Sequence, residues 1–416
     1  MRFIVKDFRL IVNTLPYARP SPRAYDNVIL HVYTRYLPQR YHLCRPACAG
    51  ERRPLMSASS WKRAAIRAAI CISLSAAVAP AAPVQAINLG AIGTIIGAGV
   101  QYASLNKQLS YLDNEGRDEF MEQVKAQYGV NYDPQANAMT ARVMENLSRS
   151  VAAIDPSILD KPYNYFVNND TSFNAFCTIG HNMSVNIGLF EPLNYNENEV
   201  AFVLAHEMGH GQENHPIEGV KKSMPLDLLA SLAGANGSAA QLGSAILSQI
   251  GTANLVTKPM EKEADKLAFE YAVGAGYNPG AGAALWQRML EKGGSVKTSG
   301  VMELFNDHPT NVSRRDTYSK TLTKWSNNVV KVDAETGMIS IRGKEWFAPA
   351  DTASMSGREQ AYLVAGNLAA VYHQNKRPTA SVHTQGQMLY VGAQPIADLS
   401  AEPNPAAVTA RLQALL

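Results

Sequence analysis

The chain has 416 residues, with 38 Lys and Arg against 35 Asp and Glu, so its formal net charge is only +3. This charge is unevenly divided: residues 1–86 hold 13 basic and 3 acidic residues, whereas the remaining residues hold 25 and 32. The basic character therefore belongs to the N-terminus, which argues against a nucleic-acid partner for the whole chain. The length is sufficient for two or three domains.

The N-terminal region predicts an export signal that begins at Met56. Three basic residues follow this methionine, residues 68–78 are apolar, and residues 84–86 (VQA) form a small-residue cleavage site. A signal peptide starts at the initiator, so we expect residues 1–55 to be an upstream extension from a mis-assigned start codon. Residues 56–86 would then be the signal peptide, and the mature protein would be exported to the bacterial periplasm or cell envelope.

The segment after the predicted cleavage site, residues 87–105, is apolar and rich in glycine. Its uninterrupted apolar stretch is too short to span a bilayer easily. Three roles stay open: it packs closely on another helix, it lies against a membrane, or it is a partly buried leader. Only Cys177 of the four cysteines lies beyond the cleavage site, so no internal disulfide is expected.

The next part of the chain predicts helices around two short strands. Residues 115–153 have the periodicity of two amphipathic helices, and residues 163–168 and 183–187 are typical of strands. Residues 228–257 contain no charged residue, which suits a lid, a membrane-facing hairpin or ordinary buried packing. A further helix is expected over residues 259–273.

The character of the chain changes near residue 325. A hairpin is expected over residues 329–342, a helix over 357–373, two short strands within 380–399 and a final helix over 405–416. These elements predict a separate small α+β module over residues 326–416, in which no metal or nucleophile pattern is found.

The motif that carries most information is HExxH, formed by His206, Glu207 and His210. Two histidines four residues apart on a helix point the same way, so both imidazoles reach one metal ion. The glutamate between them can then act on a metal-bound water. Asn196 and Glu199 form an N-x-x-E helix-start signal just before the motif. The alternative is a charged helix that matches the pattern by chance.

A third ligand is expected from a second helix, because a catalytic zinc ion needs three protein ligands and one open position. Glu261 and Asp265 are four residues apart on one helical face, whereas Glu263 is expected to point away. Glu261 would bind zinc, and Asp265 would accept a hydrogen bond from the far ring nitrogen of His206. The alternative for this acidic pair is a solvated helix face.

Several further motifs occur together with HExxH and in the same order as in a known family. They are Asn174-Ala175-Phe176, Gly188-Leu189, the helix ENEVAFVLAHEMGH, the later E-x-E-A-D, Gly276-Tyr277-Asn278-Pro279, and His308-Pro309 followed by Arg314. With them the chain resembles the HtpX-like and CAAX-prenyl-protease-like family of zinc metallopeptidases over residues 110–325. It departs from the family at residues 257–259 (TKP), where relatives often have a Ser-Arg pair, and in having neither several membrane spans nor helical repeats.

The resemblance implies a role for each matching residue. One zinc ion per chain would be bound by His206, His210 and Glu261, with Glu207 as the general base. The segment Asn174, Ala175 and Phe176 would be an edge strand that binds an extended substrate. His308 would lie near the metal and stabilise the oxyanion or fill the open coordination position, unless it is only a helix-start histidine. Arg314 would pair with an acidic group near the site, and His215 would be structural.

Together these observations predict an α+β protein: a mostly helical, zincin-like peptidase domain over residues 106–325 with a small antiparallel sheet, and the module over residues 326–416. The expected function is a zinc metalloendopeptidase that acts on protein or peptide substrates in cell-envelope quality control. Two rivals stay open. One is a zinc-binding chaperone or scaffold without turnover, and the other is a membrane-interaction protein that uses residues 87–105 or 228–257.

Overall fold

The computed structural model describes residues 102–223, 238–250, 256–293, 311–375 and 379–416. The helices in these residues are 102–113, α5 (Arg117–Tyr128), α6 (Pro134–Ala152), α7 (Glu197–Gln212), α8 (His215–Ser223), α10 (Ala239–Gln249), α11 (Lys258–Gly274), α12 (Ala281–Lys292), α14 (Asn311–Trp325), α15 (Gly357–Gln374) and α16 (Pro405–Leu415). The strands are β1 (Asn164–Asn168), β2 (Ala175–Thr178), β3 (Asn182–Asn186), β4 (Val330–Val332), β5 (Ile339–Ile341), β6 (Lys344–Phe347), β7 (Val382–Gln385), β8 (Met388–Val391) and β9 (Gln394–Asp398). Short 3-10 helices lie at Pro156–Leu159, Ile187–Leu189 and Glu191–Leu193. The predicted α+β class is confirmed.

The first sheet has the order β1-β3-β2, so β2 is an edge strand. β2 and β3 form the antiparallel pair, and β1 adds a parallel pair with β3. The tight turn between β2 and β3 uses Gly180 and His181, with φ angles of 79° and 54°. A side chain at Gly180 would meet Leu112 and Arg117, so the turn needs a glycine for close approach as well as for its backbone angle.

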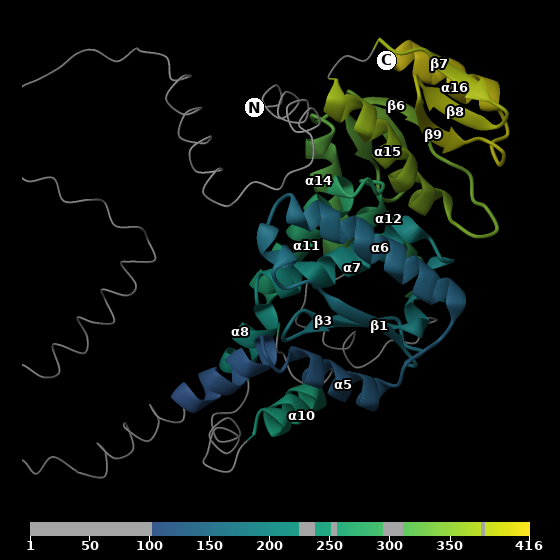
Figure 1. Cartoon of the computed structure of the whole chain (residues 1–416). Helices are drawn as coiled ribbons and strands as arrows, with labels where there is room; N and C mark the ends of the chain where they lie inside the picture. The colour runs from purple at the N-terminus through teal and green to yellow at the C-terminus, as the bar shows by residue number, and fades with distance from the viewer. Residues whose placement is uncertain (1–101, 224–237, 251–255, 294–310, 376–378) are drawn as a thin grey trace, which may run out of the picture. The chain divides into compact units, whose positions relative to one another are not determined.

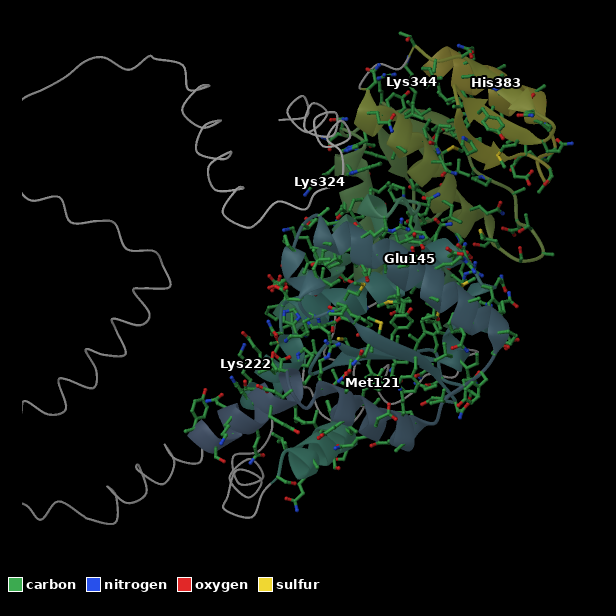
Figure 2. All side chains as sticks on the ribbon, viewed as in Figure 1. Met121, Glu145, Lys222, Lys324, Lys344 and His383 are labelled. Atoms are coloured by element: carbon green, nitrogen blue, oxygen red, sulfur yellow. The ribbon has the colours of Figure 1, made fainter. Side chains whose placement is uncertain are left out.

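Helices cover both faces of this sheet (Figure 1). α6 and α7 lie on one face, where Val167, Met183 and Val185 join the main hydrophobic core. α5 and α10 lie on the other, where Phe166 and Phe176 contribute to a second apolar cluster. This division follows from the alternation of side chains along a strand. Glu145 of α6, which is labelled in Figure 2, is exposed on the side of the helix away from this core.

Part of the uncharged stretch 228–257 falls within the described residues. Helix α10 begins at a capping box formed by Ser238 and Gln241. Its residues Leu242 and Ile246 are buried in the cluster beneath the sheet. One face of this helix is therefore packed in the protein interior, and a lid or a membrane-facing hairpin remains a prediction for the stretch. Among the described helices, none is long and apolar enough to cross a membrane.

The C-terminal region contains two three-stranded antiparallel sheets, in the orders β4-β5-β6 and β7-β8-β9. The expected hairpin and both expected helices are present. The expectation of two short strands within residues 380–399 was wrong, since three form there, and β6 was not foreseen. Short strands of about four residues contain too few alternating positions to be separated reliably by pattern.

Helix α15 of this region packs directly on the N-terminal helices rather than standing apart. Tyr362 is fully buried in the main core with residues of α7 and α12. A side chain on Gly280 would overlap the Tyr362 carbonyl, so α15 approaches the start of α12 at backbone contact. Asn278 donates to the Leu363 carbonyl and to Asn367 at 2.9 Å each. A domain boundary at residues 325–326 remains a prediction.

Candidate metal centre

The helix that carries HExxH is α7, and its start is fixed as the sequence predicts. The Asn196 side chain accepts the Asn198 N–H at 3.1 Å and donates to Glu199 at 2.9 Å. Tyr277 and Asn278, from the G-Y-N-P motif, also bond this end of the helix, through Glu197 and Asn198. The following turns of α7 are buried, so the motif lies on an anchored helix.

Close packing of α7 on α11 brings the two halves of the site together. Gly209 lies inside the HExxH motif, and a Cβ there would be 3.1 Å from Ala264 Cα. The absence of a side chain allows the two helices to approach within backbone distance. As a result Glu261, on α11, faces His206 and His210 on α7.

The three predicted metal ligands form one buried cluster, and their donor atoms all lie within 4.8 Å of one another. The Nε2 atoms of His206 and His210 are 3.1 Å apart. The Glu261 carboxylate oxygens lie 3.4 Å from His206 Nε2 and 3.3 Å from His210 Nε2. Ligands bound 2.0–2.1 Å from one tetrahedral ion are roughly 3.3 Å apart, so these spacings and the two-imidazole, one-carboxylate set fit zinc.

Asp265 lies behind His206, with one oxygen 3.0 Å from His206 Nδ1. The same carboxylate accepts the Tyr318 hydroxyl and the Arg314 Nε–H, each at 3.0 Å, from helix α14. Burial raises the pKa of Asp265, but the charge of Arg314 and the hydrogen bond from His206 outweigh it and lower the pKa to about 2. Asp265 is therefore a fixed anion that can hold His206 with Nε2 directed toward the cluster.

A second chain of contacts lies behind His210. His210 Nδ1 is 3.0 Å from His215 Nδ1, and His215 Nε2 is 3.5 Å from a Glu263 oxygen. Glu263 was expected to point away; its side chain is 54% exposed, yet it reaches around to His215. His215 thus contacts a predicted metal ligand directly, in addition to its structural place at the start of α8.

Glu207 lies against the edge strand β2. The Cys177 N–H donates to a Glu207 carboxylate oxygen at 2.9 Å. Burial, and to a lesser extent the charge of Glu261, raise the pKa of Glu207, and the result is about 7. A carboxyl group with this pKa can both accept and release a proton near neutral pH.

The edge strand presents alternate residues to the site. The Asn174 carbonyl accepts the Asn186 N–H, so its main chain faces β3. The Phe176 side chain packs beneath the sheet against the Tyr128 ring, with centroids 5.1 Å apart. Since main-chain groups alternate along a strand, Ala175 faces outward with Cys177. Of the three residues predicted to bind substrate, Ala175 therefore turns its main chain toward the outer edge of β2, where no strand of the described residues pairs.

Comparison with known proteins agrees with this geometry. Residues 134–321 match Peptidase family M48. The chain carries an M48 peptidase domain. This confirms the family predicted from the motifs, and members of the family use a metal ion.

Three relatives illustrate the similarity. The chain is 26% identical over 240 residues to the beta-barrel assembly-enhancing protease of Yersinia pestis. The matched region covers 54% of this chain and 45% of that protein. It is 27% identical over 192 residues to the mitochondrial metalloendopeptidase OMA1 of Schizosaccharomyces pombe, a match that covers 46% of this chain and 56% of that protein. It is 26% identical over 174 residues to the metalloprotease LoiP of Escherichia coli, a match that covers 41% of this chain and 67% of that protein. The chain thus matches about half the length of the first two proteins.

The M48 domain contains site residues that sequence reasoning did not single out. Tyr318 and the Trp286 ring, which lies 4.0 Å from the Arg314 guanidinium, hold Arg314 and Asp265 in place. Neither could be recognised without knowing that α12 packs on α14 and that side chains of α14 reach Asp265 on α11. His308 lies outside the described residues, so its role remains a prediction.

Proposed function

We propose that the chain is a zinc-dependent metalloendopeptidase in which His206, His210 and Glu261 hold the metal. The single observation that carries this proposal is the buried cluster of these three side chains with the Glu207 carboxyl beside it. When bound, zinc supplies Lewis acidity that polarises a peptide carbonyl and activates water. The donor set and its 3.1–3.4 Å spacings support zinc.

Glu207 would move the proton in this reaction. Its carboxylate takes a proton from the attacking water and passes it to the leaving amine. The pKa of about 7, which burial causes, suits both steps. Asp265 and His215 would act as positioning residues behind the two histidines.

An extended substrate would bind along this outer edge of β2. The outward main-chain groups of Ala175 and the Cys177 carbonyl can pair with it as an additional strand. The Cys177 N–H also points outward, but it already donates to the Glu207 carboxylate. A substrate carbonyl would therefore have to share this donor with Glu207. This arrangement would bring the scissile bond of the substrate beside Glu207, whatever the sequence of the substrate, as long as it adopts an extended conformation.

The proposal also includes the cellular location and the substrates of the peptidase. We infer that the protein is exported and degrades misfolded or unassembled envelope proteins, since the predicted signal peptide and the name of the Yersinia pestis relative both support this setting. N-terminal sequencing of the exported protein tests this: a mature start near Ile87 is expected. A peptide from residues 1–55 in the native host would refute the proposed start at Met56.

One of the two rivals is a zinc-binding chaperone or scaffold without turnover, and one experiment separates it from a peptidase. Zinc content and casein cleavage are measured for the wild type, for Glu207→Gln, and for Glu145→Gln, a matched change at an exposed carboxylate of α6. We expect about one zinc ion per chain in all three and a loss of roughly 10²–10⁴-fold in cleavage for Glu207→Gln alone. Zinc in all three without cleavage would favour the scaffold, and no zinc would show that the ligands are wrongly assigned.

A further inference from the structure

Strand β7 has an open edge in the C-terminal region. It is an outer strand of the β7-β8-β9 sheet, paired antiparallel with β8. The Gly392 N–H donates to the Ser381 carbonyl, so Ser381 faces β8, whereas the Val382 N–H points away and donates to the Gln413 side chain at 3.2 Å. By the alternation of an antiparallel ladder, both main-chain groups of Thr384 and the Val382 carbonyl also point away from β8. No partner for these three groups is found among the described residues.

The other outer strands of the two C-terminal sheets carry residues that discourage further pairing. β4 contains Lys331, β6 begins with Lys344, and β9 contains Pro395 and ends at Asp398. Charged residues and proline are the usual protection of a strand edge against addition of another strand. β7, with the sequence VHTQ, has neither, and its residues are largely exposed.

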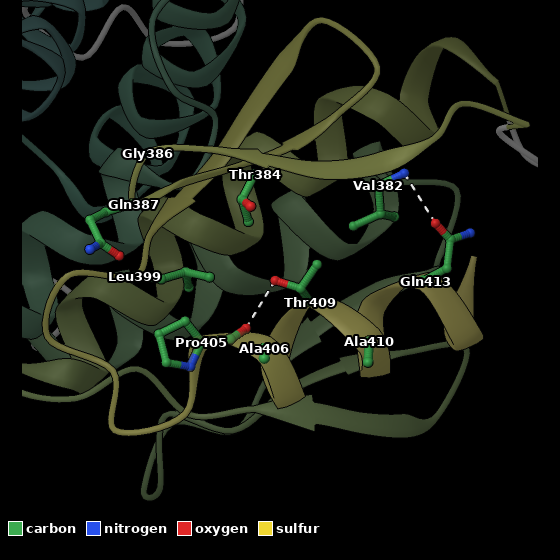
Figure 3. A pocket seen from close by; sticks show the side chains of 10 residues that line it. All are labelled: Val382, Thr384, Gly386, Gln387, Leu399, Pro405, Ala406, Thr409, Ala410 and Gln413. Carbon is green, nitrogen blue, oxygen red and sulfur yellow. Dashed lines mark hydrogen bonds between the residues drawn. The ribbon is translucent and has the colours of Figure 1, made fainter.

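A groove of about 560 Å³ runs beside this edge, between β7 and helix α16 (Figure 3). Ala406, Thr409, Ala410 and Gln413 line the helix side at spacings of three and four residues, which place them on one face. The Thr409 hydroxyl donates to the Pro405 carbonyl within its own helix, as Figure 3 shows. None of the residues that line the groove is acidic or basic.

We propose that this groove binds an extended, uncharged peptide segment of another protein, which adds to β7 as a fourth strand. Three outward main-chain groups in a row require a partner with its own main-chain donors and acceptors at strand spacing. Small side chains on α16 leave room for the partner's side chains, and the uncharged lining selects apolar or neutral ones. The site is separate from the edge strand β2 beside Glu207, so it would retain a substrate or partner segment without cleaving it.

The Gln413 side chain defines one end of the binding register. It occupies the Val382 N–H, so the added strand begins to pair at the Val382 carbonyl and continues past Thr384. At about 3.3 Å per residue, the edge from Val382 to Gln385 accommodates about four residues of an added strand. A longer partner would need to leave the groove beyond Gly386 or next to Gln413.

The test measures binding in the full chain carrying Glu207→Gln, so that the probe is not cleaved. The probe is a fluorescent hexapeptide of alternating valine and threonine, and a second probe has its alternate amide nitrogens methylated. Thr384→Pro removes the outward N–H without breaking the ladder with β8, and Thr384→Val is the matched control that keeps it. Ala410→Trp fills the groove from the helix side.

We expect the unmethylated probe to bind, Thr384→Val to bind equally, and Thr384→Pro to weaken binding about fivefold, as the loss of one hydrogen bond should. Ala410→Trp and N-methylation should each weaken binding more than tenfold. Hydrogen exchange should slow at residues 382–385 when the probe binds. Equal binding of the methylated probe would refute strand addition.

Other outcomes would overturn the site itself. Unchanged binding in both Thr384→Pro and Ala410→Trp, or slowed exchange only at residues 175–178, would place the probe elsewhere. Absence of binding in the unaltered groove would also refute the proposal. Since no readout depends on cleavage, failure here leaves the proposed peptidase activity untouched, and failure of casein cleavage leaves this test intact.

Discussion

Replacement of Asp265 by asparagine tests the anion behind His206, the first proposed metal ligand. Asp265 accepts from the Tyr318 hydroxyl and from Arg314, and lies 3.0 Å from His206 Nδ1. All of these partners can donate a hydrogen bond. In the variant, the asparagine NH2 group takes the place of one carboxylate oxygen and must face one of these donors. The negative charge of Asp265, which strengthens the hydrogen bonds, is also lost. Changes of this kind behind a metal ligand cost about 10–100-fold in metal affinity, which is about 1.4–2.7 kcal/mol.

The same substitution should lower stability without metal. Arg314 is 4% exposed, and its other acidic neighbour, Glu261, is 4.0 Å away. Loss of one partner from a buried ion pair costs about 3–5 kcal/mol when the remaining charge is uncompensated. Because asparagine retains an acceptor and Glu261 remains, we expect the lower part of that range.

Two measurements check this prediction. Competition with a chromophoric chelator gives the zinc dissociation constant, and urea denaturation in excess chelator gives the metal-free stability. Asp118→Asn is the matched control, since its side chain is 86% exposed. A zinc affinity within threefold of the wild type, together with unchanged urea stability, would refute the role of Asp265 in holding His206 and Arg314.

Three further predictions concern the surroundings of the site. His215→Leu removes the contact with His210 Nδ1 and should weaken zinc binding about tenfold by chelator competition; wild-type affinity would make His215 purely structural. Burial and a neighbouring carboxylate raise the pKa of Glu359 from 4.5 to about 9, so the folded chain holds this proton more tightly and stability should fall as pH rises between those values. In Glu359→Gln the melting temperature should change less with pH between pH 5 and 9 than in the wild type. An equally steep pH dependence in the variant would show that another group causes it. Gly209→Val would push α7 away from α11 at Ala264. It should lower the free energy of unfolding in urea by about 1–3 kcal/mol and weaken zinc binding. Wild-type stability and wild-type zinc affinity in this variant would show that the helices can separate freely.

Much of the candidate site could be predicted because its signals are local. The spacing of His206 and His210 and that of Glu261 and Asp265 each depend only on the geometry of one helix. The Asn196 cap is likewise decided within three residues. What joins the two helices is the small residue at position 209, which matters only once its neighbour on α11 is known.

The parts that escaped prediction depend on contacts between distant segments. Cys177 donates to Glu207 because β2 is an edge strand and alternates its N–H groups, which requires the strand order and register. Glu263 reaches His215 because its long side chain bends back from the exposed side of α11. Helical spacing gives the direction in which a side chain leaves the backbone but not where its end lies.

The relation between the C-terminal region and the peptidase part also depends on such contacts. Arg288 of α12 bonds Glu199 at the start of α7 and forms an ion pair with Glu359 of α15, and all three side chains are at most 2% exposed. Two carboxylates share one guanidinium here, and burial raises the pKa of both acids. The helix that carries HExxH is thus linked at its start, through Arg288, to a residue beyond position 325.

This bonding has a consequence for how the chain is divided. Removal of residues 326–416 would leave Arg288 and Glu199 without Glu359, and would expose the core around Tyr362. An interface with a buried charge cluster and backbone contact at Gly280 is built like a protein interior, whereas domains in one chain usually meet through smaller and more polar surfaces. Helix α15 therefore acts as a part of the scaffold that holds α7, while it also packs on β9 of the sheet that bears β7 and its groove.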